Sequence, residues 1–172
     1  MNYFEFYEIP MTFEIDAAAL KRIFYANSKK YHPDFYTMES DEKQAEILEL
    51  STLNNEAYKV LSNADKRMRY ILEQKEVLEA EGQNKIPQDF LMEMMDINEA
   101  LMELEFGFDE PLYQKIEADL TELEKSLEKK INPILTEFAD NQTIDLNPVK
   151  VFYLKKRYLL RIRKNLDKFV PT

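Results

Sequence analysis

The sequence contains no cysteine, one histidine and two glycines among its 172 residues. Without cysteine the chain can form no disulfide, no thiolate metal site and no cysteine nucleophile. A single histidine also leaves no histidine cluster that could bind zinc or iron. Scarce glycine, together with 45% hydrophobic and 33% charged residues, favours an ordered and mostly helical protein. We therefore expect no metal site and no cofactor.

A long apolar run is also absent. No segment approaches the roughly 20 apolar residues that a membrane-spanning helix needs. The residues from Met1 to Glu5 do not combine a basic region with an apolar one, as a secretory signal would. The expectation is a cytoplasmic protein that does not contact a membrane. Its length is sufficient for one domain or two small ones.

Positive charge is scarce between residues 73 and 110, where twelve acids face two bases. This segment accounts for the whole formal net charge of −10. Residues 150–168 show the reverse pattern, with eight bases and one acid. Such asymmetry indicates that the parts meet different partners or each other. The negative total argues against nucleic acid as a partner, because phosphate binding depends on cationic surface.

The tripeptide His32-Pro33-Asp34 separates two stretches of helical periodicity, 17–31 and 41–61. Proline lacks a backbone donor and disfavours the helical conformation at the residue before it. The pattern therefore predicts a helical hairpin with this tripeptide at its tip. The first helix contains no acid, and its cations form a basic face: Lys21, Arg22, Lys29 and Lys30. An enzyme that used His32 as general base is disfavoured, because a loop between two helices supplies neither an orienting partner nor a dry pocket.

Gly82 and Pro87 mark the best candidate for a domain boundary. Three long helical patterns follow it, and short connections between them predict an antiparallel three-helix bundle. The last pattern opens at Asn147-Pro148, which we interpret as a capping residue followed by proline. The predicted fold class is all-α, a helical hairpin followed by a bundle. The predicted first domain, linker and second domain span residues 1–75, 76–87 and 88–172.

The first helix of the predicted bundle has two apolar stripes. The expected core stripe comprises Phe90, Met94, Ile97, Leu101 and Leu104. The second comprises Leu91, Met95, Met102 and Phe106, with Met92 beyond it and Asp96, Glu99 and Glu103 beside it. An apolar stripe bordered by carboxylates suits a protein partner. A helix that touches two neighbours in a bundle also needs a broad apolar face, so the residues alone leave both interpretations open.

The first half of the sequence resembles a J-domain, and the whole resembles the HscB family of J-domain co-chaperones. The J-domain resemblance is carried by Tyr3-Phe4, Ile9-Pro10, Leu20, Tyr31-His32-Pro33-Asp34, Leu53-Asn54, Ala57-Tyr58 and Leu61. The HscB resemblance is carried by Arg67, Tyr70, Leu72, Phe90-Leu91-Met92-Glu93 and the stretch from Val149 to Leu160. Together these residues extend over nearly the entire chain.

The resemblance implies a co-chaperone with two binding sites. One would stimulate ATP hydrolysis by a DnaK/HscA-type heat-shock chaperone through His32, Pro33, Asp34, Lys21, Arg22, Lys29 and Lys30. The other would bind an IscU-type scaffold, on which iron–sulfur clusters are built, through Leu91, Met92, Met95, Asp96, Glu99, Glu103 and Tyr153, with Leu154 as the alternative to Tyr153. A J-domain co-chaperone for a different client is the alternative function. A purely structural helical protein would leave the basic face unexplained.

Three residues depart from the family pattern. Phe35 follows the tripeptide where a lysine is common, and Met95 and Asp96 stand where leucine and glutamate are usual. The cysteine pairs that bind zinc in some relatives are absent. The first departure removes a cation beside the chaperone-binding loop, and the next two bear on the affinity for the client and on its identity.

Overall fold

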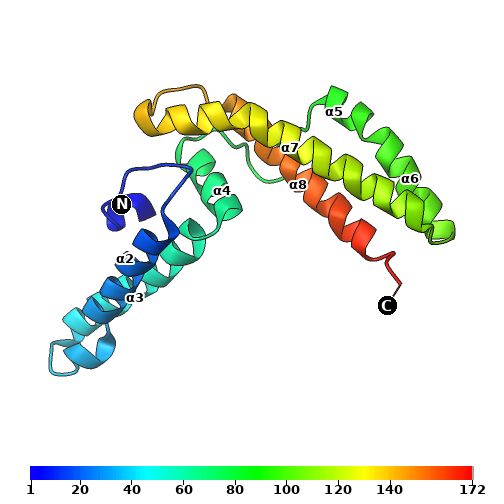
Figure 1. Cartoon of the computed structure of the whole chain (residues 1–172). Helices are drawn as coiled ribbons and strands as arrows, with labels where there is room; N and C mark the ends of the chain where they lie inside the picture. Colours follow the sequence, from blue (N-terminus) through cyan, green and yellow to red (C-terminus); the bar gives the residue numbers. More distant parts are fainter. Residues whose placement is uncertain (172) are drawn as a thin grey trace. The chain divides into compact units, whose positions relative to one another are not determined.

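The protein is helical throughout the part that the computed structural model describes, residues 1–171, and this range contains no strand. The helices in Figure 1 are α1 (Tyr3–Phe6), α2 (Ala17–Lys30), the 3-10 helix η1 (Pro33–Tyr36), α3 (Asp41–Leu61), α4 (Ala64–Gln74), α5 (Gln88–Glu93), α6 (Met95–Phe106), α7 (Glu110–Asp140) and α8 (Asn147–Asp167). The predicted all-α fold class is confirmed. Within residues 1–171 we find no helix with the length and apolar character needed to cross a membrane.

The chain divides into two compact units. Unit 1 comprises Met1–Gln74 with Phe138–Gln142, and unit 2 comprises Lys75–Glu137 and the residues from Thr143 onward. Unit 1 contains the predicted helical hairpin, and unit 2 contains the bundle together with the segment 76–87. Phe138, near the C-terminal end of α7, belongs to unit 1, where its ring centroid lies 5.0 Å from that of Phe13.

Side-chain caps define where both helices of the hairpin begin. The Asp16 carboxylate accepts hydrogen bonds from the amides of Ala18 and Ala19 at the start of α2. The Ser40 hydroxyl accepts one from the amide of Lys43 at the start of α3. These bonds satisfy backbone donors that have no partner within the helix. The Ser40 cap therefore fixes the helix start that follows the loop, and the Asp16 cap fixes the opposite end of α2.

The core of unit 1 contains one fully buried polar side chain among the described residues, Asn54, with 1% of its surface exposed. Its Oδ1 accepts a hydrogen bond from the Tyr7 hydroxyl at 2.9 Å. Its Nδ2 donates to the Phe24 carbonyl and to Ser28 Oγ, both at 3.2 Å. Asn54 lies on α3, Phe24 and Ser28 on α2, and Tyr7 caps α1. The amide therefore joins three helices.

Arg67 fixes the start of α4 against two backbone segments. Its Nε donates to the Phe13 carbonyl at 2.8 Å, and Nη1 donates to the carbonyl of Leu61. Burial lowers the pKa of Arg67 below its usual value, while the charge of Glu14 opposes that shift. An arginine that satisfies two backbone carbonyls inside the fold has a structural role.

The core of unit 2 forms between α5, α6, α7 and α8. Its fully buried members are Phe90, Met94, Leu101, Leu104, Ile116, Leu120, Leu159, Ile162 and Leu166. The predicted core stripe of the first bundle helix is confirmed, with Ile97 partly buried against the same cluster. Helices α7 and α8 lie side by side (Figure 1) and are joined by the ion pair between Arg163 and Glu124.

Two details of unit 2 differ from the sequence predictions. The first bundle helix is divided at Met94 into α5 and α6, although no proline or glycine occurs there. The interpretation of Asn147 as a helix cap is wrong. Leu146 occupies the cap position without a side-chain hydrogen bond, and Asn147 is the first helical residue. Nδ2 of Asn147 donates to Oδ1 of Asp145 at 2.9 Å, so the side-chain amide stabilises the preceding turn.

Candidate functional site

The predicted chaperone-binding tripeptide lies at the tip of the hairpin and is open to solvent. The side chains of His32 and Asp34 are 52% and 84% exposed. His32 has an extended backbone (φ −75°, ψ 123°), as expected before proline, and Pro33 opens η1. The proline therefore produces the change in chain direction that presents all three residues outward.

The imidazole of His32 is held within its own loop. Its Nδ1 accepts a hydrogen bond from the backbone amide of Asp34 at 3.2 Å. Because Nδ1 acts as acceptor, the 3.7 Å approach of Asp34 Oδ2 to the same atom is not an ion pair in this arrangement. The Asp34 carboxylate therefore remains available to an external donor such as an arginine.

The remainder of the loop is hydrogen-bonded to the end of α2. The Tyr36 hydroxyl donates to the carbonyl of Lys30 at 2.7 Å, and the amide of Phe35 donates to the carbonyl of His32 at 3.1 Å. The Phe35 ring is exposed, with its centroid 5.8 Å from that of His32 in an edge-on arrangement. The tripeptide therefore belongs to a hydrogen-bonded loop of defined conformation.

The basic face is exposed along α2. All four of its side chains, Lys21, Arg22, Lys29 and Lys30, are solvent-accessible. Within residues 1–171 none of them forms an ion pair with a carboxylate of this chain. Lys21 and Lys30 instead lie over the rings of Tyr25 and Tyr31, at 5.8 and 5.2 Å from the centroids. Their charges are thus uncompensated and can act on an acidic partner.

The predicted client strip comprises Leu91, Met92, Met95, Asp96, Glu99 and Glu103. Leu91 is half-buried, and the other five are exposed. Phe90 and Met94, on the opposite side of α5 and its junction with α6, are fully buried in the core. The interpretation of this strip as a face packed against a bundle neighbour is therefore wrong. An exposed apolar strip bordered by carboxylates remains, and binding of a client to it stays a prediction.

The predicted α8 member of that site, Tyr153, is 6% exposed, and its neighbour Leu154 is buried as well. The Tyr153 ring lies 5.7 Å from the guanidinium carbon of Arg157 on its own helix. The α8 aromatic that meets α5 and α6 is Tyr158, which the sequence analysis did not select. Its hydroxyl accepts from Nδ2 of Asn98 at 2.9 Å, and its ring packs edge-on against Phe90. The signal in the sequence that could have identified Tyr158 is its position one helical turn after Leu154, on the same side of α8.

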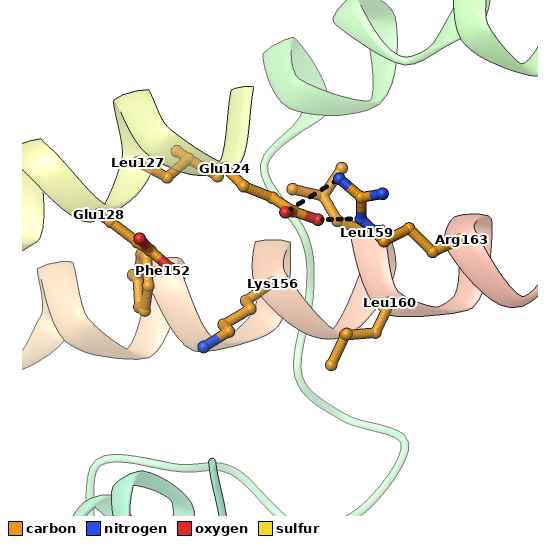
Figure 2. Close-up of a pocket in the computed structure, with 8 residues that line it drawn as sticks. All are labelled: Glu124, Leu127, Glu128, Phe152, Lys156, Leu159, Leu160 and Arg163. Atoms are coloured by element: carbon orange, nitrogen blue, oxygen red, sulfur yellow. Dashed lines mark hydrogen bonds and ion pairs between the residues drawn. The ribbon is translucent and has the colours of Figure 1, made fainter. Parts of the chain in front are cut away.

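A groove lies between α7 and α8 of unit 2 (Figure 2). Its volume is about 260 Å³, and Leu127, Phe152, Leu159 and Leu160 supply its apolar lining. At one end Arg163 binds Glu124 through two hydrogen bonds of 2.7 and 3.2 Å and also donates to Thr121. The hydrogen bond to Glu124 raises the pKa of Arg163 above its usual value. These polar groups satisfy one another, so that end of the groove stabilises the packing of the two helices.

Over the range that the structure describes, no group of three or more acidic or histidine side chains is arranged to hold a metal ion. The arrangement of the two sites offers surfaces for macromolecules. The hairpin tip provides an exposed carboxylate and a row of cations, and the client strip provides apolar surface bordered by acids. The chemistry that these residues can perform is recognition.

A family model described as "HSCB C-terminal oligomerisation domain" matches residues 86–167. The Co-chaperone protein HscB homolog of Vibrio vulnificus (strain YJ016) is 32% identical to this chain, and the match covers 77% of this chain and 81% of the relative. The Co-chaperone protein HscB homolog of Chromobacterium violaceum is also 32% identical, and the match covers 74% of each chain.

Solved structures show the same fold. The crystal structure of human co-chaperone protein HscB matches with a TM-score of 0.77 and 25% identity, over 100% of this chain and 84% of that chain. Chaperone HscB from Vibrio cholerae matches with a TM-score of 0.64 and 22% identity, over 99% of this chain and 100% of that chain. The chain has an exposed His32-Pro33-Asp34 loop and a helical bundle, and it is similar to these relatives. It therefore belongs to the HscB family of co-chaperones.

Proposed function

We propose that this protein stimulates the ATPase of a DnaK/HscA-type heat-shock chaperone and delivers to it an IscU-type iron–sulfur scaffold protein. We assign this activity to the cytoplasm. The hairpin tip and the basic face of unit 1 engage the chaperone, and the client strip of unit 2 engages the scaffold. The observation that carries the proposal is the His32-Pro33-Asp34 loop, which is ordered by its own hydrogen bonds, exposed to solvent and preceded by a helix whose four cations form no ion pair among the described residues.

The proposed mechanism in unit 1 is electrostatic docking followed by one directional contact. The basic face raises the rate of encounter with an acidic surface and orients the hairpin on it. Asp34 then forms a charge-assisted hydrogen bond with an arginine of the chaperone. The co-chaperone supplies no reacting group. It favours the hydrolysing conformation of the chaperone by binding that state more tightly.

The first test replaces His32 by glutamine. His32→Gln removes the acceptor that orders the Asp34 amide and leaves the rest of unit 1 unchanged, because the side chain contacts only its own loop. We expect an unchanged circular dichroism spectrum and loss of stimulation in a steady-state ATPase assay with a DnaK/HscA-type chaperone. Thr37→Ala, at an exposed position of the same loop, is the control and retains stimulation. Normal stimulation by His32→Gln would contradict the chaperone proposal.

The second test addresses the client. Leu91→Ala combined with Met95→Ala removes apolar surface from the client strip without entering the bundle core. We expect weaker binding to a purified IscU-type scaffold in isothermal titration calorimetry and unchanged stimulation of the chaperone in the absence of scaffold. If scaffold affinity is unchanged while His32→Gln abolishes stimulation, the alternative function applies, a J-domain co-chaperone for a different client.

A further inference from the structure

Two large apolar side chains beyond the client strip are exposed on α6, and nothing in the fold accounts for them. Met102 is 60% exposed and Phe106 is 91% exposed. Met95, Met102 and Phe106 follow one another at intervals of seven and four residues, which places them on one face of the helix. Leu101 and Leu104, on the opposite face, supply the core contacts. The exposed face therefore extends over the full length of α6, well past Glu103.

The helical segment that carries this face has charge of a single sign. Residues 86–114 contain eight acids and no lysine, arginine or histidine. Four of the acids, Asp96, Glu99, Glu103 and Glu105, are exposed on α6 itself. Among the described residues none of these four forms an ion pair with a base of this chain. A surface that covers this face must therefore bring its own cations to offset the buried negative charge.

We propose that Met102 and Phe106 form a second apolar contact for the client, continuous with the client strip, and that the client surface seated there is apolar with a basic rim. This inference rests on the proposed function and extends its binding face. The contact then runs from Leu91 to Phe106, roughly 22 Å along the helices at 1.5 Å per residue. Methionine side chains suit such a surface, because their flexible thioethers adapt to irregular shapes. A second copy of this chain is disfavoured as a symmetric occupant, because two acidic faces would repel each other.

The test measures the affinity of the full chain for a purified IscU-type scaffold by isothermal titration calorimetry. The test variant is Met102→Ala combined with Phe106→Ala. The matched control is Leu48→Ala combined with Met38→Ala, since these side chains of unit 1 are 60% and 96% exposed. We expect the test variant to raise Kd roughly tenfold and the control to leave it unchanged. We also expect the Kd of the unsubstituted protein to rise with sodium chloride concentration, because the acids and the basic rim are screened.

The outcomes separate this inference from the proposed function. If the Leu91→Ala, Met95→Ala variant binds weakly while the test variant binds as tightly as the unsubstituted protein, the second contact is refuted and the proposed function stands. If neither variant loses affinity for the scaffold, both the client proposal and this inference are refuted. Affinity that does not depend on salt would refute the basic rim. Sedimentation of the unsubstituted protein as a dimer and of the test variant as a monomer would assign the face to a second copy and overturn the proposal.

Discussion

The buried amide of Asn54 allows the sharpest test of how the hairpin is held together. Its side chain forms three hydrogen bonds, one with Tyr7, one with Phe24 and one with Ser28. In Asn54→Leu all three are lost, at about 1 kcal/mol each. No buried donor is left without a partner, because the Tyr7 hydroxyl also donates to the backbone carbonyl of residue 54 at 3.1 Å, and Ser28 Oγ also donates to the Phe24 carbonyl at 2.8 Å. With apolar burial by leucine offsetting part of the loss, we expect a decrease of about 2 kcal/mol in the free energy of unfolding.

Asn54→Asp provides a matched variant of nearly the same shape. It retains an acceptor for the Tyr7 hydroxyl but places an oxygen, in place of an N–H donor, against the Phe24 carbonyl. An ionised carboxylate in this position is buried without a cation, so at neutral pH we expect a loss of roughly 4 kcal/mol. Burial raises the pKa of such a carboxyl above about 3.9, the value in the unfolded chain. The loss is therefore smallest at acidic pH and grows as pH rises through the folded-state pKa.

The assay is urea denaturation of both variants and the unsubstituted protein, followed by circular dichroism at about pH 5 and about pH 7. Hydrogen exchange of peptides from α2 and α3 assigns the transition to unit 1. We expect the loss in free energy of unfolding caused by Asn54→Asp to be larger at the higher pH, and the loss caused by Asn54→Leu to be the same at both pH values. If the two variants are equally stable at neutral pH, or if the Asn54→Asp deficit does not depend on pH, the amide does not bridge the three helices as described.

Three further predictions concern other contacts. Burial, with a smaller contribution from Tyr58, raises the pKa of Tyr7 above its ordinary value of 10.0. The unfolded chain therefore ionises first, stability falls as pH rises above about 10, and Tyr7→Phe makes that fall shallower in urea denaturation at alkaline pH. A double-mutant cycle with Arg163→Met and Glu124→Gln should give a coupling energy of about 1 kcal/mol by thermal unfolding, because the pair is bidentate but partly exposed; additive effects would contradict the packing role of the pair. Lys29→Ser with Lys30→Ser should slow association with the chaperone about tenfold at low salt in stopped-flow measurements, and Lys125→Ser on α7 should not; equal rates would exclude docking through the basic face.

The features of this fold that the sequence predicts well depend on interactions between residues a few positions apart. Asp16 and Ser40 cap α2 and α3 by hydrogen bonds to amides two or three positions away, so the sequence shows where those helices begin. Pro33 determines the conformation of the residue before it by steric contact alone. The exposed tripeptide follows from these short-range effects, and for this reason the exposed loop at the hairpin tip was predictable from the sequence.

Features that depend on distant partners were not predictable in the same way. Asn54 is buried because Tyr7 and Phe24, 47 and 30 positions earlier, converge on its amide. Tyr158 meets α6 through Asn98, a contact 60 positions apart. Asn147 has the residue type of a helix cap, but Asp145 competes for its amide. In each case the sequence showed a polar residue with several available roles, and the tertiary structure decided among them.

The residues that carry the family resemblance divide into two groups with different physical roles. Leu20, Asn54 and Leu61 are buried and hold unit 1 together. His32 and Asp34 are exposed and contribute almost nothing to that core. A chain that kept the first group and lost the second would fold in the same way and still resemble the family over most of its length, yet it would lack the surface that we propose for chaperone binding. Support for the proposed activity therefore comes from the few exposed residues at the hairpin tip and on α2, and the fold alone does not supply it.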